Sequence, residues 1–285
     1  MDQEIKEGRG CGPNKDHVML KLSHLGREKI MERLPQIREL AMAFAGVDPI
    51  EEPIPIRPGA HYHMGGVHVD SWGAAPHMPG LFAAGECACV SVHGANRLGG
   101  NSLLEAVVYG ARTGAAAARY ATEVFNGRAP EATPAAASDY ERRLRELLER
   151  QRGPVQHEIR DELADTMQEK VGVFRTESEL REAQATVEQL RERFKGVIVT
   201  DKGRTFNQSL IHTIETGYLL DLALTMVTGA VERTESRGAH SRLDHPERDD
   251  DQWMKHTLSY LEDDQIRLDY SEVTMTTYEP QVRSY

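Results

Sequence analysis

Residues 61–104 place polar side chains such as His61, Glu86 and Arg97 among many glycines, and this segment constrains the fold more than any other. Residues 81–84 read as a short apolar strand, which a glycine and Glu86 follow. Residues 95–102 form a glycine-rich loop that leads into a helix predicted over residues 103–119. A helix N-terminus presents unpaired N–H groups and the positive end of the helix dipole. The sequence therefore predicts a site for an anion or a polar carbonyl edge at the start of this helix.

Composition excludes several classes of partner. The 285-residue chain has a formal net charge of −11, which disfavours binding to nucleic acid or directly to an anionic membrane. No run of about 18 uncharged apolar residues occurs that would span a bilayer. The first ten residues lack the apolar core of a signal peptide. Three cysteines make no disulfide framework, and the pair Cys87 and Cys89 lacks further metal ligands. We therefore expect a cytoplasmic protein without a metal site.

Four motifs follow one another in the order of a known family. They are HYHMGG at 61–66, GLFAAGE at 80–86, HGANRLGGNSL at 93–103, and ESRGAHSR at 235–242 with ERDD at 247–250. On these motifs the chain resembles the C-terminal half of the flavoprotein subunit of the succinate dehydrogenase and fumarate reductase family. Because the motifs extend over nearly the whole chain, they are more specific than a single glycine motif.

The resemblance implies that His61 and Arg97 bind a carboxylate of succinate or fumarate. A guanidinium suits this role because it binds a carboxylate with two hydrogen bonds and stays charged at physiological pH. The structural alternative for Arg97 is an ion pair with an acid such as Glu105. No catalytic residue is expected within this chain, since the family's proton-shuttle arginine should lie upstream of Met1.

The resemblance also implies FAD as the cofactor. Glu86 would contact FAD, and Ser102 and Leu103 would contribute the backbone that touches the flavin ring. Asn101 is the expected N-cap of the following helix, and His93 either faces the flavin or shapes the loop. For Glu86 the alternative is an ordinary carboxylate at a strand end.

The predicted fold class is mixed α/β and α. Residues 1–47 are expected to be the tail of a capping domain, and residues 48–130 the C-terminal part of a Rossmann-like FAD-binding domain. Residues 131–232 are expected to form a helical bundle domain, and residues 233–285 a small β-containing C-terminal region. Further helices are predicted from about residue 27, with a break at Pro35, from about 138, and over about 154–171, 178–194 and 207–232. Further strands are predicted near 18–22, 257–260, 267–270 and 271–278.

Basic and acidic residues are interleaved after residue 232, and we interpret them as a salt-bridge network that docks the tail on the flavin domain. The bases are Arg233, Arg237, Arg242 and Arg248, and the acids are Glu235, Asp244, Glu247, Asp249 and Asp250. Because the five acids outnumber the four bases, this is not a nucleic-acid patch.

Family members bind FAD chiefly through an N-terminal strand–GxGxxG–helix unit, and that motif is absent from this sequence. The isolated chain is therefore expected to be inactive. The implied partners are an iron–sulfur subunit and membrane anchor subunits, which would hold the protein peripherally on the inner face of the cell membrane. Two alternatives stay open: an L-aspartate oxidase-like flavoenzyme, and a non-catalytic remnant or assembly module that lacks the cofactor domain.

Overall fold

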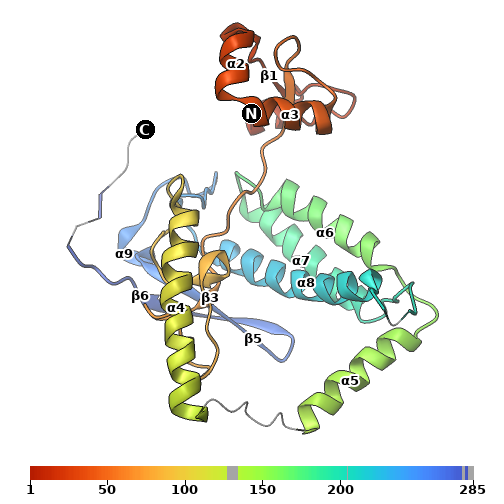
Figure 1. Cartoon of the computed structure of the whole chain (residues 1–285), viewed down its shortest axis with the longest axis vertical. Helices are drawn as coiled ribbons and strands as arrows, with labels where there is room; N and C mark the ends of the chain where they lie inside the picture. The colour runs from red at the N-terminus through yellow and green to blue at the C-terminus, as the bar shows by residue number, and fades with distance from the viewer. Residues whose placement is uncertain (127–133, 204, 278–279, 282–285) are drawn as a thin grey trace. The chain divides into compact units, whose positions relative to one another are not determined.

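The structure, a computed structural model, describes residues 1–126, 134–203, 205–277 and 280–281. Its chain forms two compact units, Met1–Ala60 and His61–Tyr285. Figure 1 labels many of the elements of both units. Each unit is described by itself.

The first unit is built from short helices and one antiparallel strand pair. Its elements are α1 (Asp2–Lys6), β1 (Val18–Leu20), η1 (Ser23–Leu25), α2 (Arg27–Arg33), α3 (Pro35–Leu40), η2 (Ala41–Ala45) and β2 (Ile54–Ile56). The predicted break at Pro35 is confirmed, because Pro35 opens α3 at a position where its missing N–H costs nothing. Strand β1 pairs with β2, so the predicted strand near residue 18 is confirmed.

The second unit begins with little regular strand. Its first elements are β3 (Val67–His68), η3 (Gly85–Cys87), β4 (Ala88–Cys89) and α4 (Asn101–Phe125), and β3 pairs with β4 in parallel. Residues 61–66 are irregular, because Gly65 and Gly66 adopt φ values of +122° and +130° just before β3. A Cβ on Gly66 would lie 2.4 Å from the carbonyl oxygen of Cys87, so only glycine allows this close approach.

Two local predictions in this region are wrong. The strand expected over residues 81–84 is reduced to an isolated bridge between Phe82 and Ala74. The N-cap of α4 is Gly100, not Asn101, because Gly100 adopts a left-handed conformation (φ +83°) and the Asn101 N–H already donates to the Leu98 carbonyl oxygen. Glycine is the residue that reaches this conformation without a steric penalty.

Three of the predicted helices pack against one another as a bundle, namely α6 (Gln156–Lys170), α7 (Glu177–Phe194) and α8 (Gln208–Glu232). Helix α5 (Pro134–Glu149) precedes them and packs Leu147 against their core. Thr176 and Asn207 cap α7 and α8 by accepting hydrogen bonds from backbone N–H groups in the first turn. The core between α6, α7 and α8 contains Ile159, Leu163, Val187, Leu190, Leu220 and Leu224.

Helix α8 is buried on one of its faces and exposed on the other. Leu220, Leu224 and Val227 are buried, whereas Tyr218 and Leu222 are exposed. Among the described helices, α8 alone has the length and apolar composition of a membrane span. A core helix of a soluble protein meets the same criterion, and α8 packs against α6, α7 and the strand β5.

The chain ends in a short helix and a hairpin. These elements are α9 (Asp250–Trp253), β5 (Lys255–Glu262) and β6 (Gln265–Glu272). Asp263 and Asp264 form the turn with positive φ values, as a two-residue hairpin loop requires. The separate strand expected over residues 271–278 is wrong: residues 271–272 belong to β6, residues 273–277 are irregular, and Tyr278 lies outside the described residues.

The interleaved charges after α8 form a salt-bridge network, but among the described residues its ion pairs lie within the tail and its hydrogen bonds reach the end of α8, and not the flavin domain as expected. Glu235 is fully buried, and its carboxylate accepts hydrogen bonds from Arg233, Arg237 and the Asp249 backbone N–H. Arg242 is 1% exposed, pairs with Asp244 and donates to the last carbonyl oxygens of α8. A cation at a helix C-terminus also stabilises the helix dipole. The network therefore fixes the tail to the end of the bundle.

His240 makes a testable contribution to the pH dependence of stability. Its Nδ1 accepts a hydrogen bond from Arg175 and its Nε2 donates to the Arg233 carbonyl oxygen, so both nitrogens are engaged in the neutral form. Burial, followed by the nearby cations Arg175, Arg233 and Arg242, lowers the pKa of His240 to about 4. Between its unfolded pKa of about 6.5 and this folded value, protons bind the unfolded chain preferentially. Stability is therefore complete above the higher value and falls as pH decreases through this window.

We expect the urea midpoint of the purified chain to fall between about pH 7 and about pH 5, and to fall less in His240→Gln. His77→Gln is the matched control, because His77 is exposed. An equal pH dependence in wild type and His240→Gln would contradict this role of His240.

Candidate functional site

The segment 61–66 contacts both η3 and the first turns of α4 through hydrogen bonds. The His63 backbone N–H donates to the Glu86 carboxylate at 3.0 Å. The neighbouring Tyr62 hydroxyl donates to Oε2 of Glu105 at 2.5 Å. Because Glu86 lies in η3 and Glu105 in α4, these two hydrogen bonds hold the segment against both elements.

Arg97 lies beside this segment. Its guanidinium carbon is 4.6 Å from the centroid of the Tyr62 ring, within the range of a cation–π interaction. Nη1 donates to the Leu98 carbonyl oxygen, whereas the buried Nε has no hydrogen-bond partner among the described residues. A buried guanidinium donor without a partner is costly in isolation and therefore suits a polar ligand.

The alternative of an Arg97–Glu105 pair is not the arrangement in the structure. Glu105 Oε2 instead accepts the Tyr62 hydroxyl hydrogen bond and lies 2.8 Å from Nε2 of His93. The His93 ring also packs edge-on against Tyr62, with centroids 5.6 Å apart. His93 therefore shapes the loop, which was one of its two predicted roles.

The first turn of α4 completes the site. No described side chain caps this helix. The Asn101 and Leu103 N–H groups donate to the Leu98 and Gly100 carbonyl oxygens, which leaves the Ser102 N–H without an acceptor among the described residues and available to a ligand. Leu103 is 74% exposed and offers an apolar surface there. An uncapped helix N-terminus together with an exposed apolar side chain fits the carbonyl edge and ring face of a flavin.

The tail holds the loop that carries Arg97. The Ala239 backbone N–H donates to the Ala95 carbonyl oxygen at 2.9 Å. Gly238 has φ +60°, and a Cβ on it would lie 2.3 Å from the same oxygen. The motif at 235–242 therefore contacts the motif at 93–103 directly, although about 140 residues separate them in sequence.

The structure thus places the segments that carry the predicted residues next to one another. His61 and Glu86 are exposed, Arg97 and Ser102 are half-buried, and Leu103 is exposed. Tyr62 was missed by sequence reasoning, although its place next to the candidate His61 was a usable signal. The role of Glu105 was also missed, and its signal is that it is the only acid in residues 101–122.

One face of α4 has no described neighbour close to its small residues. Additional Cβ atoms on Gly110 and Gly114 would meet nothing within 4 Å. Beside this stripe the exposed apolar residues are Leu103, Leu104, Val107 and Val108. The stripe of small residues that includes Gly110 and Gly114 therefore faces open space in this chain.

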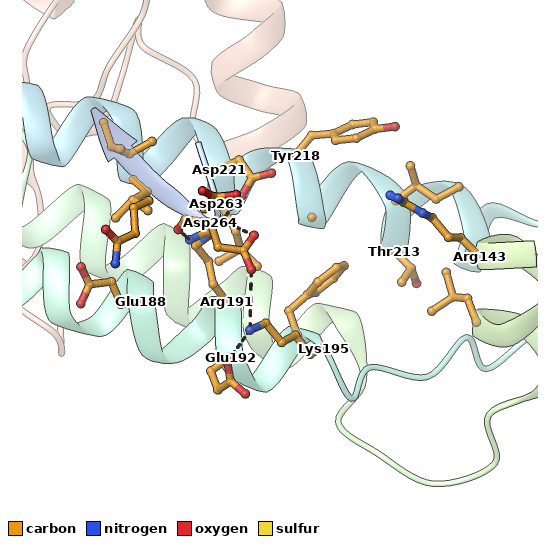
Figure 2. Close-up of a pocket in the computed structure, with 18 of the residues that line it drawn as sticks. Arg143, Glu188, Arg191, Glu192, Lys195, Thr213, Tyr218, Asp221, Asp263 and Asp264 are labelled. Atoms are coloured by element: carbon orange, nitrogen blue, oxygen red, sulfur yellow. Dashed lines mark hydrogen bonds and ion pairs between the residues drawn. The ribbon is translucent and has the colours of Figure 1, made fainter. Parts of the chain in front are cut away.

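Two other groups of polar residues lie away from this region. Glu177, Asp244 and His245 place possible ligand atoms within 4.8 Å of one another, but Asp244 already accepts hydrogen bonds from Arg242 and the Glu177 N–H. The second group lines a pocket among α5, α7, α8 and the β5–β6 turn (Figure 2). Arg191 and Lys195 of this pocket pair with its acids Asp221 and Glu192.

Comparison with known proteins identifies the family. Residues 1–103 match the family described as FAD binding domain, and residues 160–285 match fumarate reductase flavoprotein C-term. The chain belongs to the flavoprotein-subunit family of fumarate reductases and succinate dehydrogenases. The predicted resemblance and the expected cofactor, FAD, are confirmed at the level of this family.

The similarity to relatives extends over nearly the whole chain. It is 44% identical to the fumarate reductase flavoprotein subunit of Haemophilus influenzae, over 99% of this chain and 47% of that protein. It is 42% identical to the mitochondrial succinate dehydrogenase flavoprotein subunit of Oryza sativa, over 100% of this chain and 46% of that protein. The chain spans about half the length of the curated relatives that it matches.

Solved structures agree with this assignment. An E. coli quinol fumarate reductase chain is 44% identical with a TM-score of 0.89, covering 98% of this chain and 48% of that one. A chain of the Mycobacterium smegmatis Sdh1 complex is 33% identical with a TM-score of 0.78, covering 95% and 45%. The mixed fold, with part of an FAD-binding domain and a largely helical C-terminal part, is therefore that of flavoprotein subunits.

Proposed function

We propose that this chain forms the substrate-binding half of a flavoprotein that interconverts succinate and fumarate. The observation that carries the proposal is Arg97, whose buried Nε has no partner among the described residues and which lies in the loop that leads into the uncapped N-terminus of α4. Membership of the flavoprotein-subunit family supports this role. A fixed cation next to a flavin-compatible helix end is what a small dicarboxylate requires from its site.

In this proposal, Arg97 and His61 hold one carboxylate of the substrate. Their donors twist that carboxylate relative to the other one, which polarises the carbon–carbon double bond of fumarate. FAD, when bound, supplies the hydride-transfer chemistry. Glu86, Ser102 and Leu103 contribute to its binding, since the helix end stabilises negative charge that develops on the ring. One proton accompanies the hydride in each turnover, and we assign no residue of this chain to its transfer.

We assign four parts to the chain. Residues 1–47 belong to the capping domain and residues 48–130 to the Rossmann-like FAD-binding domain. Residues 131–232 form the helical bundle domain, and residues 233–285 form the C-terminal region. The open small-residue stripe of α4 supports the second assignment, because such a stripe lets a helix approach a sheet closely.

The proposed partners are an iron–sulfur subunit, which takes the electrons, and membrane anchor subunits. Through them the chain would lie peripherally on the inner face of the cell membrane. One structural neighbour is a quinol–fumarate reductase with menaquinol molecules, which supports a quinone-linked assembly. The net charge of −11 supports attachment through other subunits instead of direct binding to anionic lipid.

The proposed function is tested by assaying the FAD-loaded holoenzyme that contains this chain. We expect succinate-dependent reduction of an electron acceptor, and fumarate-dependent oxidation of a reduced dye. L-aspartate is the matched control, because it keeps both carboxylates but adds an ammonium group. Faster turnover of L-aspartate than of succinate would instead support the L-aspartate oxidase alternative.

A further inference from the structure

A chain of contacts behind the proposed substrate site ends at Arg97. Glu105 receives the Tyr62 hydroxyl, and the face of the Tyr62 ring lies against the Arg97 guanidinium. We propose that Tyr62 and Glu105 are positioning residues for Arg97, in which Glu105 fixes the phenol ring and the ring fixes the guanidinium. This inference rests on the proposed function, because Arg97 is there the group that binds the dicarboxylate.

Glu105 is a rigid anchor for this arrangement. It lies in the first turns of the 25-residue helix α4 and is 4% exposed. A carboxylate at such burial requires hydrogen-bond partners, and Tyr62 and His93 supply them. Because α4 fixes its backbone, Glu105 defines where the Tyr62 hydroxyl lies.

Tyr62 transmits this position to Arg97. Burial, together with the hydrogen bond to Glu105, raises the pKa of Tyr62 to about 12, so the hydroxyl remains a donor at physiological pH. A phenol that donates to a carboxylate has a more electron-rich ring, which attracts a cation more strongly. Cation–π contacts contribute about 0.5–2 kcal/mol, depending on how well they are desolvated.

Arg97 benefits from such support because its side chain has many rotamers. The Tyr62 ring centroid lies 4.6 Å from the guanidinium carbon, and a contact at this range restricts where the guanidinium can lie. Restricting the guanidinium plane before binding lowers the entropy lost when the dicarboxylate binds. Loss of either positioning residue should therefore weaken binding through Arg97 without removing the cation itself.

The test is a double-mutant cycle in the FAD-loaded holoenzyme, with malonate as a non-reacting dicarboxylate probe. We expect Glu105→Gln to raise the malonate Kd by about tenfold, because a misplaced guanidinium loses one of its two hydrogen bonds. In an Arg97→Gln background the same change should alter Kd by less than about twofold, since coupled residues are non-additive. A purely structural role of Glu105 would weaken binding by the same factor in both backgrounds and would overturn the proposal.

Three further variants make the test specific. Tyr62→Phe keeps the ring and deletes only the hydroxyl, so it tests the hydrogen bond even where Glu105→Gln does not accumulate. The malonate Kd of Tyr62→Phe should lie between that of wild type and that of Tyr62→Leu, which removes the ring as well. Glu123→Gln is the matched control, because Glu123 lies on the same helix and is exposed. A Tyr62→Leu enzyme with wild-type affinity for malonate would also overturn the proposal.

Urea unfolding without ligand separates this proposal from the proposed function. It uses the four forms of the cycle, which are wild type, Glu105→Gln, Arg97→Gln and the double variant. The shift in midpoint caused by Glu105→Gln should be at least about halved in the Arg97→Gln background, since the contact itself couples the residues. If wild type does not bind malonate, the proposed function fails and the unfolding cycle still decides the coupling. Additive midpoint shifts would then show that Glu105 does not act on Arg97.

Discussion

Replacing Arg97 by lysine should lower succinate or fumarate turnover of the holoenzyme by at least about a hundredfold, because misplacing a bound substrate produces losses of that order. Lysine keeps the positive charge but cannot reproduce the planar fork that binds a carboxylate with two hydrogen bonds. It also loses the flat face that packs on the Tyr62 ring. Flavin content should be unchanged, since Arg97 is assigned to substrate and not to FAD.

Arg112→Lys is the matched control for this prediction. The Arg112 guanidinium also stacks on an aromatic ring, 4.1 Å from the Trp72 centroid, and it lies on α4 away from Tyr62. Its replacement should leave turnover near the wild-type value. Near-normal turnover of Arg97→Lys would remove Arg97 from the substrate site, whatever the control does.

The helical part of the fold follows from sequence because its signals are local. Apolar residues at helical spacing locate α6, α7 and α8, and Asn207 marks the start of α8 by capping it. The break at Pro35 is equally local, since proline removes a backbone donor. These elements are specified by residues within a few turns of one another.

The elements around the site are less predictable because contacts distant in sequence decide them. The apolar run at 81–84 does not become a strand: it finds one bridging residue, Ala74, in place of a neighbouring strand. The partner of Glu105 could not be read from spacing either. Tyr62 lies 43 residues away in sequence, and Gly65 and Gly66, both with positive φ, follow it before β3. The family motifs predicted the candidate site, but they did not reveal this network.

Gly238→Ala should both destabilise the chain and reduce turnover. The new Cβ would lie 2.3 Å from the Ala95 carbonyl oxygen, a contact that backbone on both sides makes hard to relieve. Overpacking of this kind typically costs about 1–3 kcal/mol, and the left-handed backbone conformation at φ +60° adds strain for any residue with a Cβ. If the loop moves to relieve the clash, Arg97 moves with it, because Ala95 and Arg97 belong to the same short loop.

Gly94→Ala separates the two effects of the Gly238 substitution. Gly94 has a similar φ of +57°, but a Cβ there would meet nothing within 4 Å. Both variants therefore carry the backbone strain, and only Gly238→Ala carries the clash with Ala95. Urea unfolding should show a larger loss for Gly238→Ala than for Gly94→Ala, by about 1–3 kcal/mol. Equal losses in the two variants would mean that the tail does not hold the loop, and the contact between the two motifs would then have no part in placing Arg97.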